Sequence, residues 1–355
     1  MAFTTIDNPE LYFQTVLYTG NQNTQAITFD GSEDMQPDFV WIKQRADDGY
    51  SHELFDVVRG VTKYITSDTN AAEATGSTTL TAFGSDGFTL GADTIVNKNT
   101  KTYVAWNWKA GGSSSANSDG TINTTGTSVN QTAGLSISKY TGTGSNATFG
   151  HGLGATPRIV LWKRLDNDAG AVNWIVQSPI LGNQTKMVLN TTEATSTGSS
   201  FSATDDWTST TIDLKTYEGQ NHSSAVYVAY CIAEKQGYSK IGSYTGNGQD
   251  TPNGVFVHTG FSPAYILIKA LDTNSWVIVD NKRPADSNPV DDSLPANDNA
   301  DETTGNSDTT FDFLANGFRT NGNSGNNNSS GQKHIFIAFA EAPFVNSNGV
   351  PGNAR

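Results

Sequence analysis

The sequence is short of three features, and each shortage excludes a class of protein. It has one cysteine, Cys231, among 355 residues, so no disulfide can form within the chain and no cysteine cluster can hold zinc. Basic residues number 21 against 35 acidic ones, and the net charge of −14 disfavours binding to nucleic-acid phosphates or to anionic membranes. No run approaches the roughly 18 apolar residues of a spanning helix, so we expect no membrane insertion.

Charged residues are also scarce, at 16% of the chain. Ser, Thr, Asn and the 35 glycines supply most of the polar and turn-forming positions instead. Thr and aromatic residues favour pleated strands, and Asn and Gly favour turns, whereas helices favour Ala, Leu, Glu and Lys. This composition predicts a globular, strand-rich protein.

The most informative feature of the sequence is an internal repeat. The tripeptide Tyr-Thr-Gly begins at Tyr18, Tyr140 and Tyr244. Each copy is followed by a proline that opens an apolar run, and each run contains a lysine six residues after its proline. These residues are Pro37 and Lys43, Pro157 and Lys163, and Pro263 and Lys269. The copies also end alike, in "TYVAWNWKA", "VYVAYCIAE" and "IFIAFAEAP", which indicates one unit written three times.

The repeat period of just over a hundred residues suits a whole domain. Within each copy, short runs rich in Val, Ile, Phe, Tyr and Trp are bounded by Gly, Asn and Asp, which is typical of strands. We predict an all-β fold of three tandem antiparallel β-sandwich domains of jelly-roll or lectin-like form, related by internal repeat. Small barrels are the alternative.

Composition sets the predicted boundaries. The Gly/Ser/Thr-rich tract after the first copy contains few apolar residues and reads as a linker. The predicted parts are an N-terminal docking arm (1–16), repeat 1 (17–110), the linker (111–135), repeat 2 (136–236), repeat 3 (237–345) and a C-terminal tail (346–355). Repeat 3 contains a second polar, acidic tract after Arg283, which we expect to be a surface loop.

Candidate catalytic and metal sites are weak. The adjacent carboxylates Asp47/Asp48, Asp205/Asp206 and Asp291/Asp292 would point to opposite faces of a strand, so adjacency makes none of them a catalytic pair. The oxygen-rich stretches Asn297–Glu302 and Asp166–Gly170 suit calcium or ordinary turns, and neither has a twelve-residue calcium-loop pattern. Whether such an acidic loop binds calcium stays open.

Other residue types also favour structural roles. The five histidines are scattered (His52, His151, His222, His258, His334), and Cys231 lies in an apolar run. We expect Trp41, Trp106, Trp108 and Trp162 in the core, Trp174, Trp207 and Trp276 nearer turns, and Trp207 as the most exposed. The repeated lysines should snorkel at strand ends. The pairs Asp56/Arg59 and Asp280/Arg283 have no counterpart in the second copy. We assign no catalytic, cofactor-binding or metal-ligating residue and expect no cofactor.

Residues 1–112 resemble a known family. The stretches "MAFTTIDNPELYFQTVLYTGN", "MQPDFVWIKQR", "LFDVVRGVTKYITSD", "SDGFTLGAD" and "TYVAWNWKAGG" resemble a repeated domain of structural, tail-fibre-like virion proteins of marine bacteriophages. The resemblance implies a β-sandwich component of the virion and transfers no catalytic residue.

From the resemblance and the repeat we expect a non-enzymatic virion structural protein, assembled in the host cytoplasm. A tail-fibre or appendage subunit that contacts the host surface is the first form, and a capsid-decoration or head-fibre protein is the second. A glycan-binding module or depolymerase is the alternative class. Expected partners are other virion proteins through the N-terminal arm, further copies of the chain, and a host-surface glycan or protein.

Overall fold

The computed structural model describes residues 4–46, 49–168, 170–286, 288–307 and 309–352. Its regular structure is dominated by strands in three large and three small sheets, whose strand pairs are antiparallel. The described helices are short: α1 (Thr94–Asn97), α2 (Glu218–Asn221) and the 3₁₀ turns η1 (Pro9–Leu11), η2 (Pro179–Leu181) and η3 (Thr204–Asp206). The all-β prediction is confirmed. No described helix is long and apolar enough to cross a membrane.

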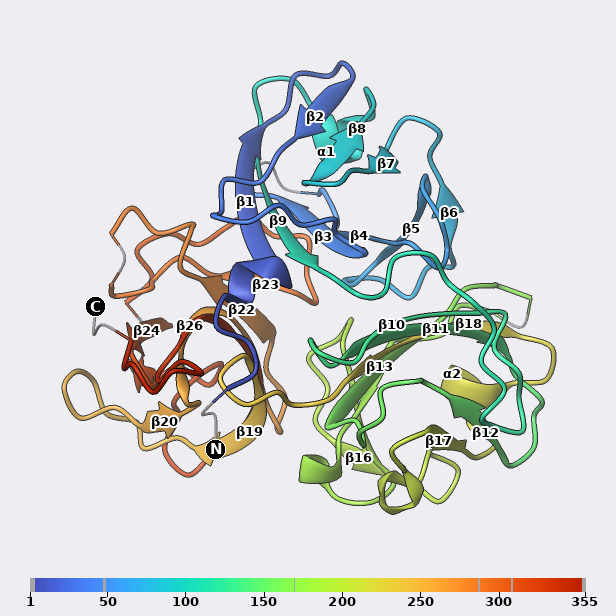
Figure 1. Ribbon diagram of the computed structural model, residues 1–355. Coiled ribbons are helices and arrows are strands. Elements are labelled where there is room, and N and C mark those ends of the chain that lie inside the picture. The colour runs from blue at the N-terminus through green and yellow to red at the C-terminus, as the bar shows by residue number, and fades with distance from the viewer. Residues whose placement is uncertain (1–3, 47–48, 169, 287, 308, 353–355) are drawn as a thin grey trace.

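The strands form three lobes around a common centre (Figure 1). In the first lobe the large sheet has the order β1 (Phe13–Thr19), β9 (Thr102–Trp108), β3 (Phe39–Gln44), β4 (Glu53–Asp56), β5 (Lys63–Thr66) and β6 (Ala74–Thr75). Its small sheet has the order β2 (Gln25–Ile27), β8 (Phe88–Leu90) and β7 (Leu80–Phe83).

The second lobe has the same order with one more strand at the edge. Its large sheet contains β10 (Gly126–Asn130), β11 (Leu135–Thr141), β18 (Val226–Ile232), β13 (Ile159–Arg164), β14 (Ile175–Gln177), β15 (Thr185–Val188) and β16 (Ser196–Thr197). Its small sheet pairs β12 (Ala147–Gly150) with β17 (Thr211–Leu214).

The third lobe repeats the arrangement with five strands in its large sheet. These are β19 (Ser239–Thr245), β26 (Lys333–Pro343), β21 (Phe261–Ala270), β22 (Trp276–Asp280) and β23 (Leu294–Pro295). Its small sheet has the order β20 (Phe256–His258), β25 (Gly317–Asn321) and β24 (Thr310–Leu314).

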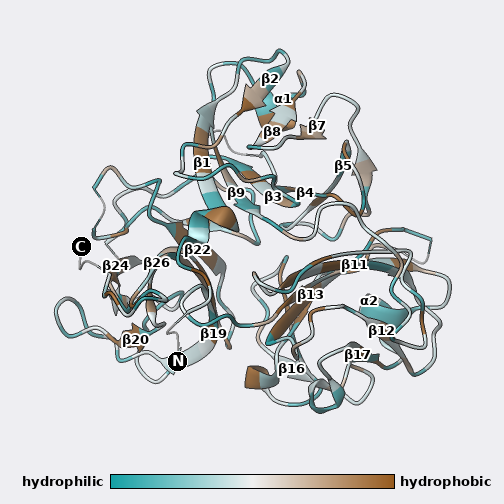
Figure 2. Cartoon of the chain, in the orientation of Figure 1, coloured by the Kyte–Doolittle hydropathy of each residue, from teal (hydrophilic) through white to brown (hydrophobic). Residues whose placement is uncertain are grey.

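The central strands of the large sheets are buried on both faces, which explains why β3, β13 and β21 are nearly continuous apolar runs. Successive side chains of a strand point to opposite faces. In β3, Val40 and Ile42 pack toward the small sheet of their own lobe, whereas Phe39 and Trp41 pack into a cluster shared by all three lobes. Both faces are therefore buried, and β3, β13 and β21 have no exposed residue. Figure 2 shows hydrophobic residues gathered on such strands, β13 among them.

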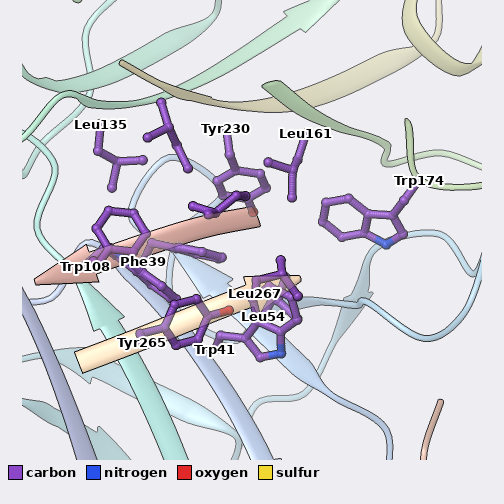
Figure 3. A pocket seen from close by; sticks show the side chains of 13 residues that line it. Phe39, Trp41, Leu54, Trp108, Leu135, Leu161, Trp174, Tyr230, Tyr265 and Leu267 are labelled. Atoms are coloured by element: carbon purple, nitrogen blue, oxygen red, sulfur yellow. The ribbon is translucent and has the colours of Figure 1, made fainter. Parts of the chain in front are cut away.

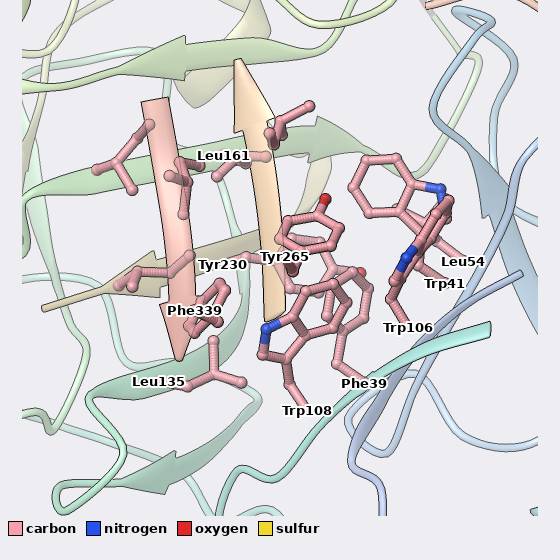
Figure 4. Close-up of a cluster of buried hydrophobic side chains, with 14 of the residues drawn as sticks. Phe39, Trp41, Leu54, Trp106, Trp108, Leu135, Leu161, Tyr230, Tyr265 and Phe339 are labelled. Carbon is pink, nitrogen blue, oxygen red and sulfur yellow. The ribbon is translucent and has the colours of Figure 1, made fainter. Parts of the chain in front are cut away.

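The core of each lobe lies between its large and small sheets, as in a sandwich. A fourth apolar cluster, which we call the central core, contains side chains from the large sheets of all three lobes. Figure 4 shows Trp106 and Trp108 of the first lobe, Leu161 and Tyr230 of the second, and Tyr265 and Phe339 of the third in this cluster. The lobes are thus joined by a continuous hydrophobic interior.

The Tyr-Thr-Gly motif closes each lobe. The tyrosine hydroxyl groups donate to backbone carbonyls: Tyr18 to Val96 at 2.7 Å, Tyr140 to Gln220 at 2.6 Å, and Tyr244 to Asn327. The glycine of the motif lies against the backbone, and a Cβ on Gly20, Gly142 or Gly246 would collide with the carbonyl oxygen of Lys98, His222 or Ser329. The motif is therefore a structural device.

Three asparagines that the sequence did not single out complete this closure. The buried side chains of Asn97, Asn221 and Asn328 accept a hydrogen bond from the backbone just after each motif, at Asn21, Thr143 and Asn247 (2.8, 2.8 and 3.1 Å). Each also donates to the carbonyl six residues earlier, at Gly91, Lys215 and Gly322. We call the motif with its asparagine the clasp.

Two predicted boundaries differ in the structure. Within the predicted linker 111–135, β10 pairs with β11 over five residues, and Ile122 is buried. The tract can form an ordered edge strand because its backbone N–H and C=O groups pair with the free edge of β11. Within the predicted arm 1–16, Phe13–Gln14 already belong to β1, and Ile6 is buried in the central core. Thr4 donates to the Gln236 carbonyl at 2.8 Å, so residues 4–16 dock on their own chain.

Candidate functional site

Corresponding residues of the three lobes make the same contact with the next lobe. A backbone N–H donates across each boundary at 2.9 Å: Glu73 to Leu165, Thr195 to Leu271, and Glu302 to Arg45. Beside each bond a ring N–H donates to a carbonyl, from Trp174 to Thr66 (2.7 Å), from Trp276 to Val188 (2.8 Å) and from His52 to Pro295 (3.0 Å). One edge of each lobe therefore lies against a loop of another lobe. The three loops are residues 66–73, 188–195 and 295–302.

His52 takes the place that tryptophan has in the other two lobes, at Trp174 and Trp276, and it makes the same hydrogen bond. Its Nδ1 accepts from the Trp41 indole at 2.9 Å, which leaves Nε2 as the donor to Pro295. The imidazole therefore carries a single proton, on Nε2, and is neutral. Burial and the positive charge of Lys43 hold the pKa of His52 well below its usual range. The histidine is therefore a neutral structural donor.

The repeated lysines are buried at the same boundaries. Lys43, Lys163 and Lys269 are at most 1% exposed, so the prediction that they snorkel to solvent is wrong. Each ammonium group donates to the carbonyl of the following residue. Lys43 also donates to Asn299, and Lys163 to Asn70, in another lobe. Backbone carbonyls at the strand ends thus bind each ammonium group inside the protein. Burial disfavours the charged form and lowers the pKa of Lys163 and Lys269 to about 8.

Each Asp/Arg pair is a buried ion pair within one lobe, and its carboxylate is also bonded to another lobe. In both Asp56/Arg59 and Asp280/Arg283 the guanidinium Nε lies 2.5 Å from the carboxylate. Each carboxylate also accepts from an aromatic donor of another lobe: Asp56 from Tyr230 at 2.7 Å, and Asp280 from Trp106 at 2.9 Å.

The second lobe lacks this pair for a reason that is visible in the sheet register. Gln177 pairs with Val160, so Ser178, the next residue, takes the place at which Asp56 and Asp280 pair with Phe39 and Tyr265. The side chain that corresponds to Tyr230 and Trp106 is Ile337, which has no donor. Carboxylate and donor are absent together, so no buried charge is left unpaired.

An apolar cavity of about 40 Å³ lies in the central core (Figure 3). Aromatic and aliphatic side chains line it, including Phe39 and Trp108 of the first lobe, Tyr230 and Leu161 of the second, and Tyr265 of the third. Such a lining offers nothing to bind a polar substrate, and small apolar cavities stay dry. The cavity is best explained as imperfect packing where three sheets meet.

Of the adjacent carboxylates weighed from sequence, Asp291 and Asp292 line one pocket of about 450 Å³, together with Asp286, Arg45 and Arg283. Asp205 and Asp206 are exposed, and Asp206 lies 3.6 Å from the Lys215 ammonium. Asp292 is buried and lies 3.8 Å from Arg45, while Asp291 is partly exposed. Asp47 and Asp48 lie outside the described residues.

The two oxygen-rich loops use their side chains internally. Asn297 accepts from the Trp276 backbone at 2.6 Å, and Glu302 binds both Arg45 (2.6 Å) and Arg283 (2.9 Å). In the other loop Asp166 binds Arg164 and the Val226 backbone, both at 2.5 Å. Within the described ranges, no group of three His, Cys, Asp or Glu residues is placed to hold a metal ion.

Histidine, tryptophan and cysteine side chains are largely buried. His52, His151 and His334 are buried, and His258 is exposed. The seven tryptophans are all at most 5% exposed, so the prediction of an exposed Trp207 is wrong. Trp207 packs edge-on against Trp162 and donates to the Ser202 hydroxyl at 2.8 Å. Burial raises the pKa of Cys231, whose thiol is therefore unreactive.

Comparison with known proteins identifies a family and no function. A family model described as a domain of unknown function, DUF7483, matches residues 8–343, which include strands of all three lobes. No curated protein and no solved structure matches the chain. Because the family model covers most of the chain, the protein belongs to the DUF7483 family.

Proposed function

We propose that the chain is three tandem β-sandwich domains derived from one repeated unit and closed into a ring with approximate three-fold symmetry. The equivalent clasps, the common strand order of the large sheets and the three equivalent boundary hydrogen bonds support this proposal. In such a ring every repeat contacts both others, as subunits do in a cyclic trimer.

We infer that this ring is a non-enzymatic structural protein of a phage particle. The observation that carries the inference is the use of the repeated charged residues. Lys43, Lys163 and the carboxylates of Asp56 and Asp280 form hydrogen bonds between lobes, whereas a repeated active site would need such charged groups to be free for a substrate. A continuous core with ion pairs at its boundaries suits a rigid particle component, in agreement with the resemblance to marine phage virion proteins.

The first form of this function is a tail-fibre or appendage subunit that contacts the host surface. Capsid decoration is the second form, and one observation favours it. The lobes pack around a single centre instead of following one another along an axis, as domains of a fibre shaft would (Figure 1). Because residues 4–16 pack on their own chain, we expect contacts with other virion proteins to use the outer surface of the lobes.

Immunogold electron microscopy of purified phage particles tests the proposal. Gold at fibres or appendages supports the first form, and gold confined to the capsid shell supports decoration. Particles that carry no label, from a preparation in which the antibody recognises the protein after denaturation, contradict a virion role. A polysaccharide-degradation assay on host envelope glycans separates the enzymatic alternative, for which we expect no product.

A further inference from the structure

The second lobe covers the open side of its own sandwich. The Thr125 N–H donates to the Lys139 carbonyl at the free edge of β11, at 2.8 Å. The Ile122 N–H donates at 2.8 Å to the Thr148 carbonyl at the free edge of β12, and the Ile122 side chain is buried in the core of the lobe. One stretch of chain therefore bonds to both sheets and closes the sandwich on this side. We call this stretch, residues 111–130, the cover.

The third lobe has the same two edges, at β19 and β20. Ser243 of β19 corresponds to Lys139, because each of them directly precedes the tyrosine of the motif. Phe256 of β20 corresponds to Thr148, because the residue after each of them makes the equivalent pair in the small sheet. Ser243 and Phe256 are therefore the places at which a cover would bond.

Both edges of the third lobe are free at these two residues. Hydrogen bonds alternate between the two sides of a strand. Since Gly246 and Val255 bond inward, the backbone groups of Ser243 and Phe256 point outward. Within the described ranges nothing bonds to these groups, and both residues are exposed. The start of β19 is closed by residues 234–235, which bond to its first outward N–H groups, so the free site runs from Ser243 to Phe256.

A groove of about 490 Å³ lies at the end of this open side. Its walls come from the start of β19 and the end of β20, and they include His258 and Phe344. His258 corresponds to Gly150 of the second lobe, which lies so close to the cover that an added Cβ would collide with Asn117. The groove therefore lies where the second lobe has its cover.

The open side also exposes aromatic side chains. Phe256 is 47% exposed, and Phe344, which lines the groove, is 37% exposed. An exposed apolar side chain on an unpaired edge strand favours pairing with another chain. The third lobe thus presents both the backbone groups and the apolar surface that an added segment would use.

The first lobe closes the same side with its own loop. Its connection from the small sheet to β3 has twelve residues from Ile27 to Phe39, against eight between the corresponding positions of the third lobe. The Ser32 N–H of this loop donates to the Glu10 carboxylate at 2.7 Å, which holds the loop against the chain that enters β1. The third lobe has neither this long loop nor a cover in its described residues.

We propose that the open side of the third lobe binds an extended segment of another protein, which bonds to β19 and β20 as the cover bonds to β11 and β12. Addition of a segment to a free sheet edge is a common mode of peptide recognition, in which backbone hydrogen bonds supply affinity and side-chain pockets supply specificity. An apolar side chain of the segment would enter the groove beside Phe344. The inference deepens the proposed function and rests on it for the source of the segment, which is a neighbouring protein of the particle.

Charge favours a foreign segment over a second copy of this chain. Two copies, each with a net charge of −14, repel each other, and the cover of each copy is already bonded in its own second lobe. The basic residues beside the site are also paired, Lys240 with Glu234 at 3.3 Å and Arg319 with Asp312 at 2.6 Å. We therefore expect the segment to be uncharged or basic.

The test uses a fluorescent peptide with the sequence of residues 113–131, the part of the cover that bonds to both edges. Fluorescence anisotropy follows its titration with the purified full-length protein. We expect saturable binding with a dissociation constant below about 1 mM, because several backbone hydrogen bonds form together. Ile122→Asp in the peptide should weaken binding by about tenfold or more, since it places a charge where an apolar side chain is buried. Ala116→Asp adds the same charge at an exposed position and should leave binding unchanged.

Variants of the third lobe locate the site. Ser243→Pro removes the outward N–H of an edge strand and should weaken binding by about fivefold or more, whereas Ser243→Ala keeps this N–H and should have no effect. Phe256→Ala removes the exposed ring and should weaken binding by about fivefold or more. Val61→Ala truncates an exposed side chain of the first lobe and serves as its control. Dependence on Ser243 and Phe256 also distinguishes this site from exchange of the peptide with the cover of the second lobe.

Three outcomes overturn the inference. They are no binding of the peptide, unchanged binding in both Ser243→Pro and Phe256→Ala, and self-association of the full chain in sedimentation that Phe256→Ala abolishes. Thermal unfolding shows whether each variant is folded, and Phe256→Ala, at an exposed residue, remains a test if Ser243→Pro does not fold. Since no phage particle is used, failure here leaves the virion proposal untouched, and absence of gold label leaves peptide binding untouched.

Discussion

At the scale of the residue, the protein uses buried polar side chains as fixed parts of its framework. The clasp asparagines are 0% exposed, and each of them links the turn after Tyr-Thr-Gly to the end of the small sheet. An amide suits this place because it donates and accepts at once. Removing it leaves backbone groups on both sides unpaired.

The clasp can be tested by truncating its asparagine. Asn97→Ala, Asn221→Ala and Asn328→Ala should each lower the free energy of unfolding by about 2–4 kcal/mol, because several buried hydrogen bonds are lost together. Urea denaturation followed by tryptophan fluorescence measures the change, with the exposed Asn146→Ala as the control. Losses below about 0.5 kcal/mol, the usual effect of surface changes, would show that the clasp is dispensable.

Glu53 is a buried carboxyl group that the sequence did not single out. It is 4% exposed, and its Oε2 has no hydrogen-bond partner. Burial, together with the negative charges of Asp68 and Asp93, raises the pKa of Glu53 to about 8. The folded protein therefore keeps a proton on Glu53 at neutral pH, where the unfolded chain has lost it.

This difference makes stability depend on pH. Between the ordinary Glu pKa of about 4.5 and the folded value of about 8, only the folded state holds the proton, so Glu53 makes the protein less stable as the pH rises. Glu53→Gln should remove this effect and stabilise the protein by about 2–4 kcal/mol at pH 8, with little effect below pH 4.5. Urea midpoints across this range measure it. A gain that is equal at all pH values, or a similar profile in the exposed Glu193→Gln, would contradict the explanation.

At the scale of the element, strand positions were predictable and strand partners were not. The apolar runs that Pro37, Pro157 and Pro263 open are predicted to be strands, and they correspond to β3, β13 and β21. Their apolar content on both faces did not reveal that one face belongs to a core shared between lobes. Which face is shared depends on how distant segments pack, and the sequence of one strand does not contain this. The hydrogen bond from Tyr230 to Asp56, which lies 174 residues away, could not be predicted for the same reason.

The tract 111–135 shows the limit of composition as a guide. Gly, Ser and Thr indicate flexibility when nothing lies beside them, but an open sheet edge supplies partners for their backbone groups. In the structure β10 pairs with β11, and Ser115 bridges Thr127. With Val129 as its one apolar residue, β10 carries no alternating pattern that would predict a strand.

Limited proteolysis distinguishes an ordered tract from a flexible linker. We expect proteinase K under native conditions to leave residues 126–130 intact, because a paired strand cannot enter a protease cleft without local unfolding. Mass spectrometry of the fragments reads the result. Rapid cleavage within 126–130, ahead of exposed loops such as that after Arg283, would show that β10 is not stably paired.

At the scale of the whole molecule, the central core makes the three lobes depend on one another. Phe39, Leu161 and Tyr265 come from different lobes and lie in the same cluster. Separating the lobes would expose these side chains to water, which costs about 25 cal/mol per Å² of apolar surface. The lobes should therefore not unfold independently.

Calorimetry tests this dependence. We expect one unfolding transition for the full chain, and Trp106→Ala should lower the stability of the whole molecule by about 3–5 kcal/mol because it leaves a cavity in the central core. A parallel change in the core of one lobe, Phe318→Ala, should shift the same single transition. Two or three resolved transitions, of which only one responds to either substitution, would mean that the lobes fold separately.

The boundary contacts have a direction, since each lobe offers a ring donor on one side and a receiving loop on the other. Between separate molecules such a contact can continue without limit and build a filament. Here the third loop, 295–302, is occupied by His52 and Lys43 of the same chain, so neither half of the contact is left for a neighbour. Because these contacts are closed within one chain, separate molecules cannot polymerise through them. Many copies could be held side by side at high density and remain separate particles.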